Sequence, residues 1–165
     1  MRASLLLLAL ATSVFGAELR LDSAALDAAK PAKLSLQLQS GGTELSGLQF
    51  DVEYDAARFD VKIEIGPAAE DAVKVLQTNT LQPGKQRVLI FGFNRTRLPD
   101  GVMAFAHVSL KSGEAGQAGT EPGQSYPIRI SEPAGTTSEG QAVRIQATAG
   151  SVTTGRDAAT RSKSR

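Results

Sequence analysis

The sequence predicts an all-β protein that folds as a single β-sandwich of the jelly-roll type, with about nine strands. Apolar residues alternate strictly with polar ones between Gly47 and Ile63, which is the period of a strand with one buried face. Glycine and proline turn signals separate a series of such short segments along the chain. No segment has the pattern of a convincing helix, so the strands are expected to pack on one another.

Before residue 66, four segments show strand patterning. Each carries apolar residues at every second position and is bounded by turn-forming residues. These segments are 19–21, 34–38, 48–54 and 59–65. The alanine-rich stretch at residues 22–30 is expected to be a loop, because Pro31 would end a helical turn that started there.

After residue 66, turn signals become more frequent. Gly66-Pro67 breaks the chain, and residues 72–76 form a weak strand or a helical turn. The strand segments here are 87–93, 102–110, 127–130 and 143–152. Residues 112–124 and 132–140 are rich in glycine and are expected to be loose loops.

The same alternation predicts which side chains form the core. Residues on the inward rows of the strands should be buried together between the two sheets. The expected core consists of Leu36, Leu38, Phe50, Val52, Phe59, Val61, Ile90, Val108, Ile128 and Ile145.

The chain divides into three parts by composition. Residues 1–16 combine an early arginine, a short apolar run and small residues, which is typical of a secretory signal peptide cleaved after Gly16. Residues 17–153 form the sandwich domain, and the basic segment 154–165 is expected to be a disordered tail. No later segment approaches the roughly 20 apolar residues of a membrane-spanning helix, so the mature chain is expected to be secreted or periplasmic.

Composition excludes several classes of function. The chain contains no cysteine, which rules out disulfides, thiolate metal sites and a cysteine nucleophile. The formal net charge is +1, and the basic tail leaves a mildly acidic domain body. Such a body argues against nucleic-acid binding, which needs a clustered basic face.

Six features in order resemble the cohesin domain, the module that docks dockerin-bearing enzymes in cellulosomes. They are the alternating strand from Leu34, the strand 48–55 ending in Tyr-Asp, the strand 59–65, the apolar strand 87–93, the segment Asp100-Gly101-Val102-Met103-Ala104, and the closing Gly150-Ser151-Val152. The likeness covers about 120 residues of the mature domain. Ala56 stands where the family usually has proline, and Gly47 and Gln49 stand where dockerin-binding members often have asparagine and aspartate.

The resemblance implies a secreted, non-catalytic binding module whose partner is a dockerin-like protein, such as a dockerin-bearing polysaccharide-degrading enzyme. The same sandwich superfamily includes carbohydrate-binding modules, so direct binding of polysaccharide is the alternative. The absence of tryptophan weakens this alternative, because sugar-binding faces usually rely on exposed aromatic platforms. A structural or envelope protein without a discrete ligand remains a third interpretation.

The partner surface is expected on the outward face of the strand 48–54 and on the loop that follows the strand 87–93. Alternation places Gln49, Asp51 and Glu53 on one side of the sheet, where solvent and a partner meet them. The loop adds arginines of opposite charge, and mixed polar surfaces of this kind determine register and specificity. The candidate residues are Gly47, Gln49, Asp51, Glu53, Asn94, Arg95 and Arg97.

No catalytic centre, metal site or cofactor site is expected. His107 is the only histidine, and no glycine-flanked serine motif accompanies it. The acidic residues Asp51, Glu53, Asp55 and Asp60 are interpreted as a solvated strand face rather than a calcium loop or a pair of glycosidase carboxylates. Asn94-Arg95-Thr96 has the form of a glycosylation sequon and is treated as incidental.

Overall fold

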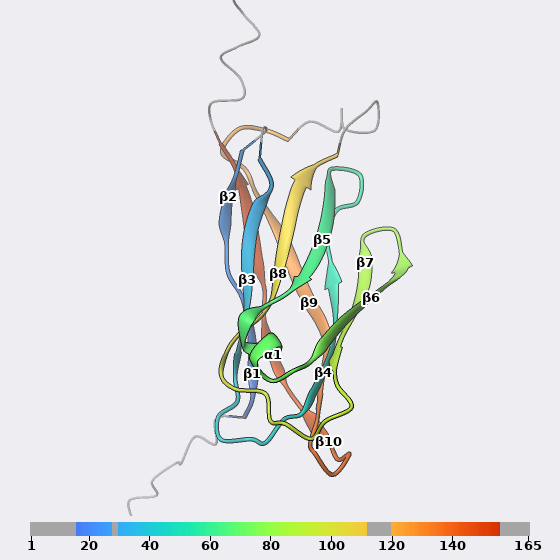
Figure 1. Ribbon diagram of the computed structural model, residues 1–165. Helices are drawn as coiled ribbons and strands as arrows, with labels where there is room; N and C mark the ends of the chain where they lie inside the picture. The colour runs from blue at the N-terminus through green and yellow to red at the C-terminus, as the bar shows by residue number, and fades with distance from the viewer. Residues whose placement is uncertain (1–15, 28–29, 112–119, 156–165) are drawn as a thin grey trace, which may run out of the picture.

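The computed structural model describes residues 16–27, 30–111 and 120–155. These residues form a β-sandwich of two mixed sheets with one short helix (Figure 1). One sheet has the strand order β11-β1-β3-β8-β5, and the other has the order β2-β12-β9-β4-β7-β6, with β10 paired to β9. The all-β fold class and the sandwich architecture expected from the sequence are therefore confirmed.

The described residues contain twelve strands rather than about nine. The first sheet consists of β1 (Glu18–Leu21), β3 (Ala32–Gln39), β5 (Phe59–Ile65), β8 (Gly101–Leu110) and β11 (Gln146–Thr148). The second consists of β2 (Ala24–Leu26), β4 (Gly47–Glu53), β6 (Val75–Gln82), β7 (Lys85–Phe91), β9 (Ser125–Thr136), β10 (Ala142–Arg144) and β12 (Gly150–Thr154). The helix α1 (Pro67–Asp71) lies between β5 and β6 in the chain.

Two segments expected to be loops contain strand structure. Residues 24–26 form β2 because they pair in parallel with β12, and a pairing between such distant segments leaves no local signal. Strand β9 continues through residues 132–136, where glycine and proline suggested a loop. Gly135 is needed there for packing, since a Cβ at this position would collide with the side chains of Leu45 and Ile145.

The Gly66-Pro67 break is the start of helix α1. Proline suits the first turn of a helix because its missing N–H would have no partner there. Ala68 and Ala69 are buried, and the helix packs on β8. Gly66 lies so close to the backbone of Val102 that a Cβ would stand 2.5 Å from the Val102 carbonyl oxygen, so glycine is required.

All ten predicted core residues are buried, each with at most 8% of its surface exposed. The inward face of β4 illustrates the pattern, since Leu48, Phe50 and Val52 are buried and lie opposite Ile90, Val88 and Gln86 of β7. The period-two pattern therefore identified the correct face of this strand.

Three other expectations fall wholly or partly outside the described residues. Residues 1–15 of the expected signal peptide and residues 156–165 of the expected tail lie outside the described residues, as do residues 112–119 of the long loop. Within the described ranges, no helix has the length and apolar character needed to cross a membrane.

Candidate functional site

The candidate site is the outer face of the strands β9, β4, β7 and β6. Backbone pairing arranges its side chains in rows that cross the strands. In one row Glu53 lies opposite Lys85 of β7 and Arg129 of β9. The next rows centre on Asp51, opposite Arg87 and Ser131, and on Gln49, opposite Leu89 and Ala134. The face is therefore charged at the Glu53 end and apolar towards Gly47.

Asp51 is the centre of the charged end, and it is not solvated as the sequence suggested. Its side chain has 0% exposure because neighbouring side chains on the outer face cover it. The Arg87 guanidinium donates two hydrogen bonds to the carboxylate, from Nε to Oδ1 at 2.7 Å and from Nη2 to Oδ2 at 3.0 Å. Lys85 Nζ lies 3.3 Å from Oδ2. These cations, Arg87 above all, lower the pKa of Asp51 despite its burial.

Glu53 extends this network to the end of β4. Its Oε1 atom accepts a hydrogen bond from the Ser131 hydroxyl at 2.5 Å and lies 2.9 Å from Lys85 Nζ. The Ser131 hydrogen bond and then Lys85 lower the pKa of Glu53, and Glu53 in turn raises the pKa of Lys85. The four charges of Asp51, Glu53, Lys85 and Arg87 thus stabilise one another in their ionised forms, which suits a fixed recognition surface and not proton transfer.

The other end of the face holds an apolar groove of about 410 Å³. Phe91 lines the groove and is 37% exposed. Val75 lies opposite Phe91 on β6, outside the groove lining, and is 52% exposed. Leu89 is half-buried beside them. Other residues that line the groove include Gly47, Gln49, Gln77, Ala134 and Ala142. The outer row of β7 is therefore partly open to solvent, with Leu89 half-buried and Phe91 exposed.

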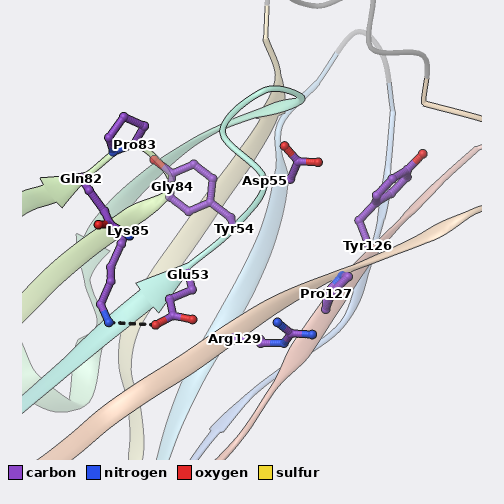
Figure 2. Close-up of a pocket in the computed structure, with 10 residues that line it drawn as sticks. All are labelled: Glu53, Tyr54, Asp55, Gln82, Pro83, Gly84, Lys85, Tyr126, Pro127 and Arg129. Carbon is purple, nitrogen blue, oxygen red and sulfur yellow. Dashed lines mark ion pairs between the residues drawn. The ribbon is translucent and has the colours of Figure 1, made fainter.

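A second hollow, of about 510 Å³, lies where β4 ends beside the β6–β7 hairpin and the start of β9. Figure 2 shows Glu53 and Lys85 paired at its edge and Tyr54 close to Pro83 and Gly84. Neither tyrosine here offers a free flat platform. The Tyr54 hydroxyl accepts a hydrogen bond from Gln86 at 2.8 Å, and the Tyr126 ring packs edge-on against Phe59 with centroids 5.2 Å apart.

The loop after β7 lies near the Gly47 end of the face and not beside the carboxylates. Asn94 has a structural role, since its Oδ1 accepts a hydrogen bond from the buried Lys74 at 2.7 Å and its Nδ2 donates to the Val73 carbonyl at 2.9 Å. Arg95 is exposed, and Arg97 pairs with Glu44 at 3.1 Å. The strand expected to reach Phe93 ends at Phe91, and Phe93 projects fully into solvent from the loop.

The cations that face Asp51 and Glu53 are therefore Lys85 and Arg87, which the sequence analysis did not select. A signal for them was present. Lys85 and Arg87 are two residues apart, as are Asp51 and Glu53, so antiparallel pairing of the two strands brings each cation opposite a carboxylate. The candidate residues Gly47, Gln49, Asp51 and Glu53 do share one face, and Asn94, Arg95 and Arg97 flank its far end.

His107 lies on the opposite side of the molecule, on the outer face of the five-stranded sheet. Its Nε2 atom is 3.1 Å from Glu64 of the neighbouring strand β5. Among the described residues, no group of three histidine, aspartate or glutamate side chains is arranged to hold a metal ion.

The fold and the site were compared with known proteins. No protein-family model matches the chain, and a search of curated proteins found no match. Solved structures do match. The sixth cohesin of scaffoldin B from Acetivibrio cellulolyticus, solved in complex with the Cel5 dockerin, aligns with a TM-score of 0.69 over 84% of this chain and 98% of its own, at 21% identity. The chain has the cohesin fold.

Two further structures show how widely this fold is shared. The cohesin of the Coh-OlpC–Doc435 complex from Clostridium thermocellum has a TM-score of 0.70, with 14% identity over 89% of this chain and 98% of its own. A non-cellulosomal cohesin from the hyperthermophilic archaeon Archaeoglobus fulgidus has a TM-score of 0.67, with 10% identity over 92% of this chain and all of its own. The expected likeness to cohesins is therefore confirmed at the level of the fold.

Proposed function

We propose that this cohesin-like domain is an exported, non-catalytic module that binds a protein partner through the outer face of β9, β4, β7 and β6. The observation that carries the proposal is the apolar groove around Leu89 and Phe91. An exposed apolar patch with a polar border is typical of an interaction site. Aromatic and large apolar side chains in the centre of such a patch supply most of the binding energy.

The charged end of the face complements this groove. Arg87 and Lys85 hold Asp51 and Glu53 in fixed positions, so a partner meets a surface whose polar groups are already oriented. Preorganised charges of both signs favour one docking register over others, because a shifted partner would bring like charges together. The groove therefore provides affinity, and the charged end provides specificity.

The partner class that we propose is a dockerin-type domain. The Acetivibrio cellulolyticus and Clostridium thermocellum structures that share the fold are complexes of a cohesin with a dockerin. In this chain the equivalent architecture presents a groove of about 410 Å³ and a charged border on one sheet face. Gly47 adds to the groove because it has no side chain to fill it.

Binding of dockerin-like domains encoded in the source genome tests the proposal. Titration calorimetry, run with and without calcium, would measure their affinity for the chain and for two phenylalanine variants. Phe91→Ala removes the exposed ring in the groove and should weaken binding by about tenfold or more. Phe105→Ala is the matched control, because Phe105 lies half-buried on the outer face of the other sheet, under Lys33.

Two outcomes would contradict the proposal. One is that no dockerin-like domain of that genome binds at micromolar concentration. The other is that Phe105→Ala abolishes binding while Phe91→Ala binds like the unmodified chain, which would place the partner on the opposite sheet. A parallel pull-down on insoluble polysaccharide tests the carbohydrate-binding alternative directly.

A further inference from the structure

Strand β6 has a free edge that is unusual for its length and composition. It pairs with β7 on one side, and no described strand pairs with its other side. Its eight residues, Val75–Gln82, include no charged residue, no proline and no glycine. A long uncharged edge of this kind exposes a row of backbone N–H and C=O groups that can accept another strand.

The other edges of the two sheets are protected. Strand β5 carries Asp60, Lys62 and Glu64 on its outer face, and such charges discourage edge-to-edge pairing. Strands β2 and β11 have only three residues each, as does β10. Strand β6 has a register irregularity between Thr80 and Gln82, at Leu81 near the hairpin end. Residues 75–80 pair regularly with β7, so the regular part of a second pairing would run between Leu76 and Thr80.

We propose that β6 is a dimerisation edge, on which β6 of a second copy of this chain adds in antiparallel orientation with the two-fold axis at Thr78. In this register Thr78 lies opposite Thr78 of the second copy, and Gln77 lies opposite Asn79. Val75 then lies opposite Leu81. These two residues are the exposed large apolar residues of the strand, at 52% and 43% exposure. In this register the second copy covers both residues, and no charged side chains lie opposite one another.

The surroundings of β6 fit this arrangement. A groove of about 600 Å³ runs between β5 and β6. Its apolar lining is Ile63, Ile65, Val75 and Leu76, and its charged lining is Glu64, Glu70 and Lys74. In this register Leu81 of the second copy lies beside Val75 on the outer-face side of β6, and Thr80 of the second copy lies beside Leu76 at the groove. Contact between the exposed Leu81 and Val75 therefore adds apolar side-chain burial to the backbone pairing. The backbone pairing belongs to the free edge of β6 and does not depend on the proposed function, whereas the Val75–Leu81 contact lies on the outer-face side of the strand.

Single cysteines provide a register-specific test, because the chain itself contains no cysteine. Thr78→Cys places the two thiols opposite one another at the axis, where Cα atoms of paired strands are about 5 Å apart. Thr80→Cys is the matched control. It is an equally exposed threonine on the same strand, but its two copies would be offset by four residues, or about 13 Å. Under a mild oxidant, Thr78→Cys should form covalent dimer about tenfold faster than Thr80→Cys.

Sedimentation of the full chain provides the second measurement. The unmodified chain should show a concentration-dependent dimer, and Thr78→Lys should raise its dissociation constant by about tenfold or more, because two ammonium groups would meet at the axis. Ala25→Lys, on the short exposed edge of β2, should leave it unchanged. Equal cross-linking of the two cysteine variants, a purely monomeric chain, or a Thr78→Lys dimer as strong as the original would each overturn the proposal.

Discussion

Gly84→Ala should destabilise the domain far more than Gly140→Ala, although the two glycines have nearly the same backbone conformation. Their φ angles are +78° and +82°, in the left-handed region that alanine adopts only at a cost. That cost is about 1–2 kcal/mol. Alanine also lowers the conformational entropy of the unfolded chain, which stabilises the folded state of both variants by about 0.4–1 kcal/mol. Both variants carry the same two backbone effects, so these effects nearly drop out of the difference in stability between the variants.

The difference between the two sites is what a Cβ would meet. Nothing lies within 4 Å of a Cβ at Gly140. At Gly84 a Cβ would collide with the carbonyl oxygen of Tyr54, which cannot move freely because the Tyr54 N–H donates to the Gly84 carbonyl at 2.9 Å. Overpacking of this kind typically costs about 1–3 kcal/mol. We expect a loss of about 1 kcal/mol for Gly140→Ala and about 2–4 kcal/mol for Gly84→Ala.

Urea denaturation followed by circular dichroism would measure both free energies of unfolding by linear extrapolation. Equal losses within about 0.5 kcal/mol would refute the reasoning, because they would show that the Pro83-Gly84 turn moves away from Tyr54 at little cost.

Four other predictions follow from the same structure. Phe50→Ala should cost about 3–5 kcal/mol in a urea titration, since the ring is 1% exposed, and a loss below about 1 kcal/mol would contradict its place in the core. Arg87 lowers the pKa of Asp51, so the Asp51 carboxylate stabilises the fold above its unfolded-state pKa, and this stabilisation is lost as the pH falls through the lower folded-state pKa. The free energy of unfolding should therefore drop on acidification below about pH 4. The Asp51→Asn variant should show a shallower drop. Mass spectrometry of the exported protein should find Ala17 at the N-terminus, because Ala17 is 1% exposed in the core, whereas an intact initiator methionine would exclude cleavage. Assays on polysaccharides and esters should detect no turnover, and an activity that disappears in His107→Ala would show that the protein is an enzyme.

Local alternation was sufficient to predict the central strands and the core. Strands such as β3 and β4 have one face on the core and one face outward, so their own sequence states which residues are buried. The alternation also grouped Gln49, Asp51 and Glu53 on one face correctly.

The remaining features depend on residues far away in the chain. Asp51 is buried because Arg87 and Lys85 of another strand cover it, and no property of β4 alone reveals that cover. Strand β2 forms because it pairs in parallel with β12. Gly135 is required by close packing and not by a turn. The shift of the arginine loop away from the carboxylates follows from where β7 ends, and strand ends are set by pairing rather than by composition.

The two parallel pairings have a consequence for the order in which the molecule assembles. Strand β1 pairs with β11 and β2 pairs with β12, so the first described segment of the chain joins its last strands, one in each sheet. Neither sheet can reach its full strand order until the ribosome has made residues 146–154. Contacts of such high sequence separation form late and slow folding. A chain built in this way completes both sheets only after its last strands have been synthesised.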